Sequence, residues 1–234
     1  MKHHLSYCAL ALALSLNANA ALMLFNFNDL TNGVGVTAVT EYHTVKSPVL
    51  TLEGKDVVLD GQAGVRYTDA SGTTHPAGQA AAWTSGINDS GGNSMTLHFD
   101  ATGFQDFQIR YDYRASADGC PSADFQYRVG DSGDFVSAGI YTYARDAAFH
   151  AVSVSLTSLT SLNGASSVDF RWVLAPGSSQ GTFRIDNLEL TATAVPEPRE
   201  YALVVGLGLW VFAGYRRRRG LHLTRIWRTD APAP

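Results

Sequence analysis

Cysteine is scarce in this sequence, with only Cys8 and Cys120 among its 234 residues. Cys8 lies in an N-terminal segment that we expect to be removed, which leaves Cys120 alone and excludes an internal disulfide in the mature protein. A lone thiol in an exported protein is either a free reactive group or an intermolecular link. Because Gly119 and Pro121 predict a turn around it, we expect a partly buried Cys120 there instead.

Positive charge is scarce in the central part of the chain. Between Ala21 and Ala194, nine Lys and Arg stand against eighteen Asp and Glu, a formal charge of −9. A surface that binds nucleic acid needs a basic footprint, so we expect no nucleic acid as a partner. Fifteen of the eighteen acids are Asp. Asp in loops mostly serves in turns, and calcium ligation is the second interpretation.

Catalytic motifs are absent as well. The sequence has no Gly-x-Ser-x-Gly, no His-Glu-x-x-His and no glycine-rich phosphate loop. No two histidines of the expected mature protein lie three to five residues apart, so a zinc site is not indicated. Paired carboxylates can hydrolyse glycosides, but eighteen acids make such a pair an unspecific signal. We therefore expect a protein that is not an enzyme and has no catalytic residue.

What the sequence does contain is a repeated alternation of apolar and polar residues. Between Phe107 and Tyr113 every second residue is apolar, and similar short runs recur between turn clusters. A period of two indicates antiparallel strands with one buried face. We predict an all-β, antiparallel β-sandwich, jelly-roll-like, as an extracellular domain over residues 21–194. Within it, only Ala77–Ser85 has a pattern that fits a short helix.

The N-terminus has the pattern of an export signal. Lys2 precedes the apolar run Leu5–Leu16, and small residues stand at Ala18 and Ala20, the two positions that a signal peptidase reads. A helix of twelve residues spans only about 18 Å, too short for the ~30 Å hydrocarbon core. We therefore predict a signal peptide at 1–20 that is cleaved after Ala20.

The C-terminal end begins with a proline-rich linker at 195–201. Its first four residues are Val195, Pro196, Glu197 and Pro198. Because proline fixes φ and removes a hydrogen-bond donor, this stretch is expected to be stiff and extended. The linker therefore predicts a site that a protease can reach.

An uncharged apolar stretch follows at 202–215, and we predict a single transmembrane helix of about 21 Å there. It ends at four consecutive arginines, Arg216, Arg217, Arg218 and Arg219. Clustered arginines stay on the cytoplasmic side of a membrane. The domain is therefore expected outside, with residues 216–234 as a basic cytoplasmic tail.

The order of Val-Pro-Glu-Pro, short hydrophobic helix and arginine run resembles the PEP-CTERM sorting signal of Gram-negative bacteria, over Val195–Gly220. The resemblance implies that exosortase, a membrane-embedded cysteine protease, recognises the Pro-Glu-Pro region and processes the chain there. It also implies an association with exopolysaccharide and biofilm production. One departure is the fifteen-residue continuation Gly220–Pro234, since such chains usually stop soon after the arginines.

The first and last predicted strands of the domain carry candidate metal ligands. In the closing strand the alternation slips by one residue at Asn187, which requires a β-bulge. The two strands resemble those of jelly-roll carbohydrate-binding and galactose-binding-like domains. That resemblance implies that the strands pair and hold a structural calcium, for which Asn28, Asp29 and Asp186 would supply oxygen ligands. The alternative is that these residues only serve in a turn and at the bulge.

Exposed aromatic rings are candidate platforms for the faces of sugars. Trp83, Tyr141 and Tyr143 qualify because they lie near turns or in weakly patterned segments. For Trp83, a place in the core beneath a loop is the favoured alternative. Trp172 alternates in phase with Phe170 and is predicted to lie in the core.

These patterns together predict a non-catalytic, exosortase-processed protein of the cell surface or extracellular matrix, with a role in adhesion, biofilm association or glycan binding. It would pass through an inner-membrane intermediate with the domain in the periplasm. Its expected partners are signal peptidase, exosortase, the membrane and a polysaccharide. The alternatives are a secreted polysaccharide-active enzyme on a jelly-roll fold and a purely structural surface module.

Overall fold

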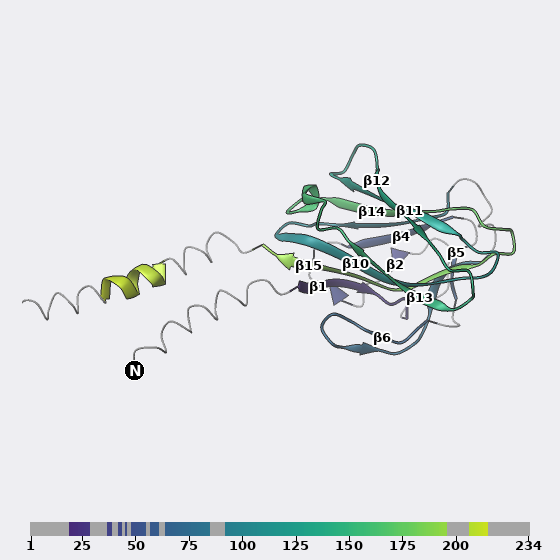
Figure 1. Cartoon of the computed structure of the whole chain (residues 1–234), viewed down its shortest axis with the longest axis horizontal. Helices are drawn as coiled ribbons and strands as arrows, with labels where there is room; N and C mark the ends of the chain where they lie inside the picture. The colour runs from purple at the N-terminus through teal and green to yellow at the C-terminus, as the bar shows by residue number, and fades with distance from the viewer. Residues whose placement is uncertain are drawn as a thin grey trace, which may run out of the picture. The chain divides into compact units, whose positions relative to one another are not determined.

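The computed structural model describes residues 19–28, 37–38, 42–43, 45, 48–54, 57–60, 64–84, 92–195 and 206–214. The chain divides into one unit over Met1–Val195 and a second over Pro196–Pro234. The first unit is a sandwich of two antiparallel sheets (Figure 1). The prediction of an all-β antiparallel sandwich is confirmed.

Sheet A has the strand order β13-β10-β15-β1-β3, and β8 joins β15 on the side where β1 ends and in turn pairs with β5. Its strands are β1 (Asn19–Phe25), β3 (Tyr42–His43), β5 (Val57–Asp60), β8 (Ala80–Trp83), β10 (Phe104–Ala115), β13 (Phe149–Ser155) and β15 (Phe183–Ala194). The longest of them, β10 and β15, lie side by side at its centre.

Sheet B has the order β12-β11-β14-β9-β4-β2. Its strands are β2 (Thr37–Ala38), β4 (Val49–Glu53), β9 (Ser94–Phe99), β11 (Ser122–Val129), β12 (Val136–Thr142) and β14 (Val168–Leu174). From β9 to β15 the chain crosses between the sheets at every connection except the hairpin β11–β12. This alternation is that of a jelly roll.

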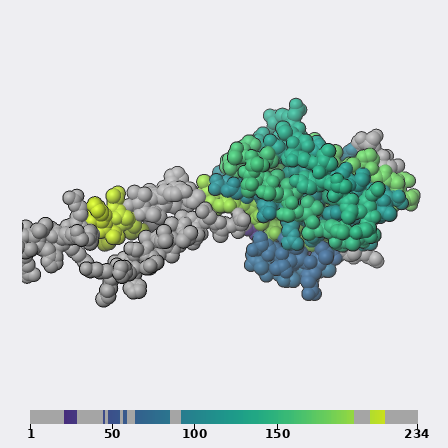
Figure 2. Space-filling model, in the orientation of Figure 1, coloured from purple at the N-terminus to yellow at the C-terminus, as the bar shows by residue number. Residues whose placement is uncertain are grey.

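A third, two-stranded sheet stands apart from the sandwich layers. It is the hairpin of β6 (Tyr67–Thr68) and β7 (Thr74–His75), which pair only with each other. The hairpin projects from the body of the domain, as the blue lower part of Figure 2 shows. Within the described ranges of this unit, the short 3-10 helix η2 (Thr160–Leu162) is the only helical element.

Aromatic side chains fill the space between the two sheets. Trp172 of β14 is fully buried, and its ring centroid lies 4.9 Å from that of Phe125. The edge of Tyr111, from the opposite sheet, meets Trp172 at 5.9 Å and 87°. Such offset and edge-on contacts are the favoured geometries for buried rings. The prediction that Trp172 lies in the core is confirmed.

The expected bulge in the closing strand is present. Along β15 the pairing with β10 passes from Glu189 to Asp186 while β10 advances only from Arg110 to Asp112, so β15 has one residue more. Asn187 has a φ of 51° there, in the left-handed region. Before the bulge, at Phe183–Ile185, β15 pairs with β8; after it, from Leu188 on, β15 pairs with β1. The bulge therefore marks the point where β15 changes its neighbour.

Two local expectations need correction. The segment expected to be helical forms strand β8 at Ala80–Trp83. Its main chain pairs with β5 on one side and β15 on the other, and all four residues are buried. Tertiary pairing there outweighs the helix propensity of alanine. Cys120 is fully buried rather than partly buried. Its thiol donates to the main-chain oxygen of Ser122, and burial raises its pKa to about 12.

The second unit is described only as a helix over 206–214. This helix lies inside the stretch 202–215 that is predicted to cross the membrane. Within the described part of the chain, no helix has both the length and the apolar character needed for a membrane span. The remainder of 202–215 and the arginines Arg216–Arg219 lie outside the described residues.

Candidate functional site

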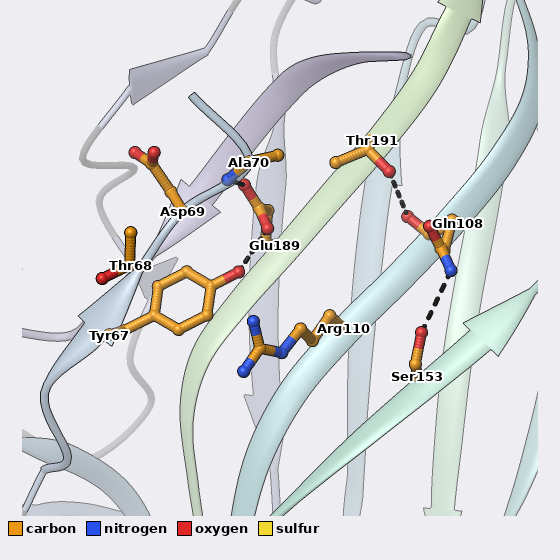
Figure 3. Close-up of a pocket in the computed structure, with 9 residues that line it drawn as sticks. All are labelled: Tyr67, Thr68, Asp69, Ala70, Gln108, Arg110, Ser153, Glu189 and Thr191. Atoms are coloured by element: carbon orange, nitrogen blue, oxygen red, sulfur yellow. Dashed lines mark hydrogen bonds between the residues drawn. The ribbon is translucent and has the colours of Figure 1, made fainter. Parts of the chain in front are cut away.

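A cavity of about 330 Å³ lies between the outer face of sheet A and the hairpin β6–β7 (Figure 3). The sheet contributes Gln108 and Arg110 from β10, Ser153 from β13, and Glu189 and Thr191 from β15. The opposite wall is the hairpin stretch Tyr67–Ala70. We call this cavity the sheet A pocket.

Strand periodicity aims the polar side chains of β10 into the pocket. Phe107 is buried in the core, whereas Gln108 and Arg110 are exposed on the outer face. Because β10 lies between β13 and β15, the register places Arg110 opposite Ser153 on one side and Glu189 on the other. The floor of the pocket is thus a row of side chains from three neighbouring strands.

Glu189 joins this floor to the hairpin. Its carboxylate accepts hydrogen bonds from the Tyr67 hydroxyl and, at 2.8 Å, from the main-chain N–H of Ala70. The guanidinium carbon of Arg110 lies 4.6 Å from the centre of the Tyr67 ring, a cation–π contact. Burial and the neighbouring Glu189 carboxylate raise the pKa of Tyr67. Tyr67 therefore stays protonated, and its hydroxyl donates a hydrogen bond to Glu189.

Asp69 organises the turn of the hairpin. One of its carboxylate oxygens accepts from the N–H groups of Ser71 and Thr73, both at 2.9 Å, and from the Ser71 hydroxyl at 2.6 Å. The other oxygen lies 3.0 Å from Nε2 of His75. Burial acts to raise the pKa of Asp69, but these hydrogen bonds outweigh it and lower the pKa. Since Asp69 separates Ser71 from His75, the three do not form a catalytic triad.

The chemistry of the pocket suits binding better than catalysis. Its two carboxylates, those of Asp69 and Glu189, already accept hydrogen bonds from the protein. A general acid needs a raised pKa, and the pKa of Asp69 is lowered. The other polar groups of the floor include the Arg110 guanidinium, the Gln108 amide and the Ser153 hydroxyl, and the Gln108 amide donates to the Ser153 hydroxyl at 3.1 Å. These are the kinds of group that bind hydroxylated ligands.

The aromatic residues singled out in the sequence do not line this pocket. Trp83 and Tyr143 are buried in the core, so neither offers a ring face to a sugar. For Trp83 this confirms the favoured alternative, and for Tyr143 the expectation is corrected. Trp83 donates from Nε1 to the main-chain oxygen of Glu53 at 3.0 Å. The hydroxyl of Tyr143 shares a hydrogen bond with Tyr111. Each ring therefore has its polar atom satisfied inside the domain.

Tyr141 is half-buried in β12. Its ring lies edge-on to Phe125, with centroids 6.2 Å apart. Burial raises the pKa of Tyr141. It belongs to sheet B, whereas the pocket lies on the outer face of sheet A, so it does not extend the same binding surface.

Two of the three candidate calcium ligands lie at neighbouring places of the structure. Asp186 is buried, and its carboxylate accepts from the N–H groups of Val65 at 2.7 Å and Asn187 at 2.8 Å. The Asn28 amide oxygen accepts from the N–H of Gln79 at 2.8 Å. Asp29 lies outside the described residues.

A pair of glycines connects these two ligands. Gly64 donates its N–H to the oxygen of Gly78 at 2.8 Å. A Cβ atom on Gly64 would lie 2.6 Å from both a carboxylate oxygen of Asp186 and the main-chain oxygen of Gln79. A Cβ on Gly78 would overlap the amide oxygen of Asn28. Side-chain and main-chain oxygens thus lie so close to Gly64 and Gly78 that neither position has room for a side chain.

A carboxylate, an amide oxygen and main-chain oxygens are the donor types that a hard cation takes. Burial and, to a smaller extent, the nearby Asp112 carboxylate outweigh the hydrogen bonds from Val65 and Asn187, so the pKa of Asp186 is raised to about 7. A Ca²⁺ ion would supply the missing positive charge and takes carboxylate, amide and main-chain oxygens. Among the described residues, no three His, Cys, Asp or Glu side chains gather as a metal cluster. The fit therefore rests on Asp186, Asn28 and main-chain oxygens.

The processing residues lie at the edge of what the structure describes. Ala20 lies in β1, where it pairs with Ala192 of β15, and Ala18 lies outside the described residues. Val195 directly follows β15, and its N–H donates to the oxygen of Gly103 at 2.8 Å. Residues 196–198, the remainder of the Val-Pro-Glu-Pro motif, are not among the described residues.

Sequence reasoning missed Tyr67, Arg110 and Glu189. One signal was available for Glu189, which is one of only three Glu between Ala21 and Ala194 and stands between Leu188 and Leu190 in the closing strand. A charged residue in such a strand indicates a specific partner. Its partner Tyr67 lies 122 positions away in the chain, and no local pattern identifies a pair so distant.

No protein-family model and no curated protein matches this chain. Among solved structures, the CBM22-1-CBM22-2 tandem domain of Paenibacillus barcinonensis Xyn10C is similar at 15% identity and a TM-score of 0.49, over 78% of this chain and 49% of that one. The CBM22-1 xylan-binding domain of the same protein has 12% identity and a TM-score of 0.42, covering 76% and 98%.

A cyclase from Fischerella sp. TAU has 15% identity and a TM-score of 0.39, covering 77% and 100%. At identities and TM-scores this low, none of the three similarities assigns a ligand or an activity to this chain.

Proposed function

We propose that this chain is an exported, non-catalytic glycan-binding protein, and that the sheet A pocket is where the sugar binds. The observation that carries the proposal is the pocket itself, in which an exposed arginine, an amide and hydroxyls of sheet A face the aromatic ring of Tyr67 on the hairpin. Sugar hydroxyls both donate and accept, so they need neutral amides and hydroxyls beside a few charged groups. A volume of about 330 Å³ is in the range of small-ligand sites.

Replacing Arg110 by alanine tests this site. A hydrogen bond from a charged donor contributes about 1.5–3 kcal/mol, so Arg110→Ala is expected to weaken glycan binding about tenfold or more. Affinity electrophoresis of the processed protein in gels containing xylan, β-glucan, galactan, alginate or polygalacturonate measures the loss. The matched control is Arg145→Ala, an exposed arginine outside the pocket, which should bind as the unchanged protein does.

Other outcomes of this experiment favour the alternative functions. If the unchanged protein is retarded by none of the polysaccharides while its fold is intact, the chain is a structural surface module. Release of reducing sugar ends from any of them would favour a polysaccharide-active enzyme. That hypothesis draws on the presence of Asp69 and Glu189 beside Tyr67 in one pocket.

We also propose that the domain is exported, processed by exosortase, and delivered to the cell surface or extracellular matrix of a Gram-negative bacterium, where it associates with exopolysaccharide or biofilm. The support is the order of signal peptide, Val-Pro-Glu-Pro, apolar stretch and Arg216–Arg219 in the sequence. The proposed intermediate is held in the inner membrane by residues 202–215, with the domain in the periplasm.

Deleting Pro196–Pro198 is expected to abolish processing and leave the full-length precursor in the inner membrane. The measurement is the size and location of the protein on immunoblots of fractionated cells that contain an exosortase. Deleting Gly220–Pro234 is the matched control, since it leaves the three-part signal complete. If the Pro196–Pro198 deletion is processed as the unchanged chain is, the sorting proposal is wrong.

A third proposal concerns a structural Ca²⁺ ion, bound by Asp186 and Asn28 with main-chain oxygens near Gly64 and Gly78. It is supported by the crowding of oxygens at Gly64 and by the buried carboxylate of Asp186, whose pKa burial raises. The ion would join β1, β15 and the segment before the hairpin. Its role would be in stability, because Asp186 and Asn28 do not line the sheet A pocket.

A further inference from the structure

We infer that Glu189 is the latch that holds the β6–β7 hairpin on sheet A, and that it is a positioning residue for the sheet A pocket. The identity of the ligand rests on the proposed function, whereas the role of Glu189 in holding the hairpin does not depend on it. It adds a coupling between the docking of the hairpin and the existence of the binding site.

The hairpin cannot hold its place by its own strands. β6 and β7 have two residues each and, among the strands that the structure describes, pair with each other and not with sheet A or sheet B. A two-stranded hairpin is at best marginally stable in water, even when its strands are longer. Its position must therefore come from contacts with the sandwich.

Glu189 supplies these contacts from an immobile position. It lies in β15 between β10 and β1, and only 3% of its surface is exposed. The Tyr67 hydroxyl, from the hairpin's first strand, and the Ala70 N–H, two residues after that strand, both donate to its carboxylate. Docking the hairpin removes this carboxylate from water, and the two hydrogen bonds offset the cost of that removal.

Arg110 strengthens the same junction. It is the cross-strand neighbour of Glu189 on β10, and its guanidinium stacks on the ring of Tyr67. Tyr67 is thus held at its hydroxyl by Glu189 and at its ring face by Arg110. Tyr67 therefore links the hairpin to two neighbouring strands. The chain just before the hairpin is held separately, because Val65 is hydrogen-bonded to Asp186 and Asn187.

Docking and binding must be coupled, because the hairpin supplies a whole wall of the pocket. Tyr67–Ala70 come from the hairpin, and the other lining residues come from sheet A. When the hairpin is undocked, only the flat polar floor remains. The apparent affinity for a ligand falls in proportion to the fraction of molecules with a docked hairpin. A variant that undocks nine molecules in ten would thus weaken binding about tenfold.

The test is Glu189→Gln, which keeps the size of the side chain and replaces one acceptor oxygen by an N–H₂ donor. Hydrogen exchange of the Ala70 amide is measured by NMR on the full chain in mild detergent, together with trypsin cleavage after Arg66. We expect exchange at Ala70 to become about tenfold faster and cleavage after the exposed Arg66 to increase. Exchange in β11 and β14, at the far sheet, should not change.

Two further variants keep the test decisive. Tyr67→Phe removes the hydroxyl and keeps the ring, and it should accelerate exchange at Ala70 in the same direction even if Glu189→Gln folds poorly. The matched control is Glu53→Gln, since Glu53 accepts from the Ser94 hydroxyl on the other sheet and should leave Ala70 unaffected. Unchanged exchange at Ala70 in both Glu189→Gln and Tyr67→Phe would overturn the latch.

The same variants separate the latch from the proposed function. If no polysaccharide binds but Ala70 exchanges faster in Glu189→Gln, the latch stands and glycan binding is wrong. If glycan binds and exchange at Ala70 accelerates without any loss of affinity, the coupling between docking and binding is wrong. A loss of affinity that matches the fraction of undocked hairpin supports both.

Discussion

A Trp172→Ala variant is expected to lose about 3–5 kcal/mol of its free energy of unfolding, the usual cost of removing a buried Trp or Phe. Trp172 is fully buried in the middle of β14 and contacts rings from both sheets. Phe125 lies beside it in sheet B, and Tyr111 approaches from sheet A. Because rigid strands surround the ring, the cavity left behind cannot collapse, which places this site at the costly end of such substitutions.

Urea-induced unfolding, followed by far-ultraviolet circular dichroism, measures this loss as a lower midpoint. Ile140→Ala is the control, because Ile140 is also a large apolar residue of a strand but is 73% exposed. Its free energy of unfolding should change by no more than about 0.5 kcal/mol. Equal midpoints for Trp172→Ala and the unchanged protein would show that the sheets are not packed around this ring.

Removing calcium is expected to have the second largest effect. A ligand present at a hundred times its dissociation constant stabilises the folded state by about 2.7 kcal/mol. For a domain of this size, chelation should therefore lower the melting temperature by roughly 5–10 °C. Asp186→Asn should abolish this response, because it removes the one carboxylate among the proposed ligands that the structure describes.

Differential scanning calorimetry in Ca²⁺ and in chelator gives both values. Asp186→Asn also removes the acceptor of one of two main-chain N–H groups, those of Val65 and Asn187, so the readout is the change in melting temperature between Ca²⁺ and chelator within each variant. The exposed Asp146 gives the matched control Asp146→Asn, which should respond to Ca²⁺ as the unchanged protein does. A melting temperature that is the same in Ca²⁺ and in chelator would remove Asn28 and Asp186 from the list of ligands.

Local pattern was sufficient to predict most of the sandwich. The alternation at Phe107–Tyr113 is strand β10, and the slip at Asn187 is the bulge in β15. Both follow from the period of two, which is a property of a few neighbouring residues. Ala80–Trp83 was misassigned because an alanine-rich stretch has helix propensity, and only its two neighbouring strands decide otherwise.

The binding site was beyond the reach of such patterns. Trp83 and Tyr143 were chosen for lying near turns, but a ring near a turn can point inward, as both of these do. Arg110 and Glu189 were ordinary outward positions until the register set them side by side beneath Tyr67. Register between strands so far apart in the chain depends on the whole fold and not on any segment of it.

Strand β15 also determines how the domain would carry a pulling force. It lines the pocket at Glu189 and Thr191 and leaves the domain at Val195, where the proposed sorting region begins. A pulling force from a polymer bound in the pocket would pass along β15 from Glu189 to Val195, only a few residues, without being transmitted through the core. Between Leu188 and Thr193 that strand is bonded to β1, and at Thr191, Thr193 and Ala194 to β10. Several hydrogen bonds would therefore be sheared together, rather than opened one after another.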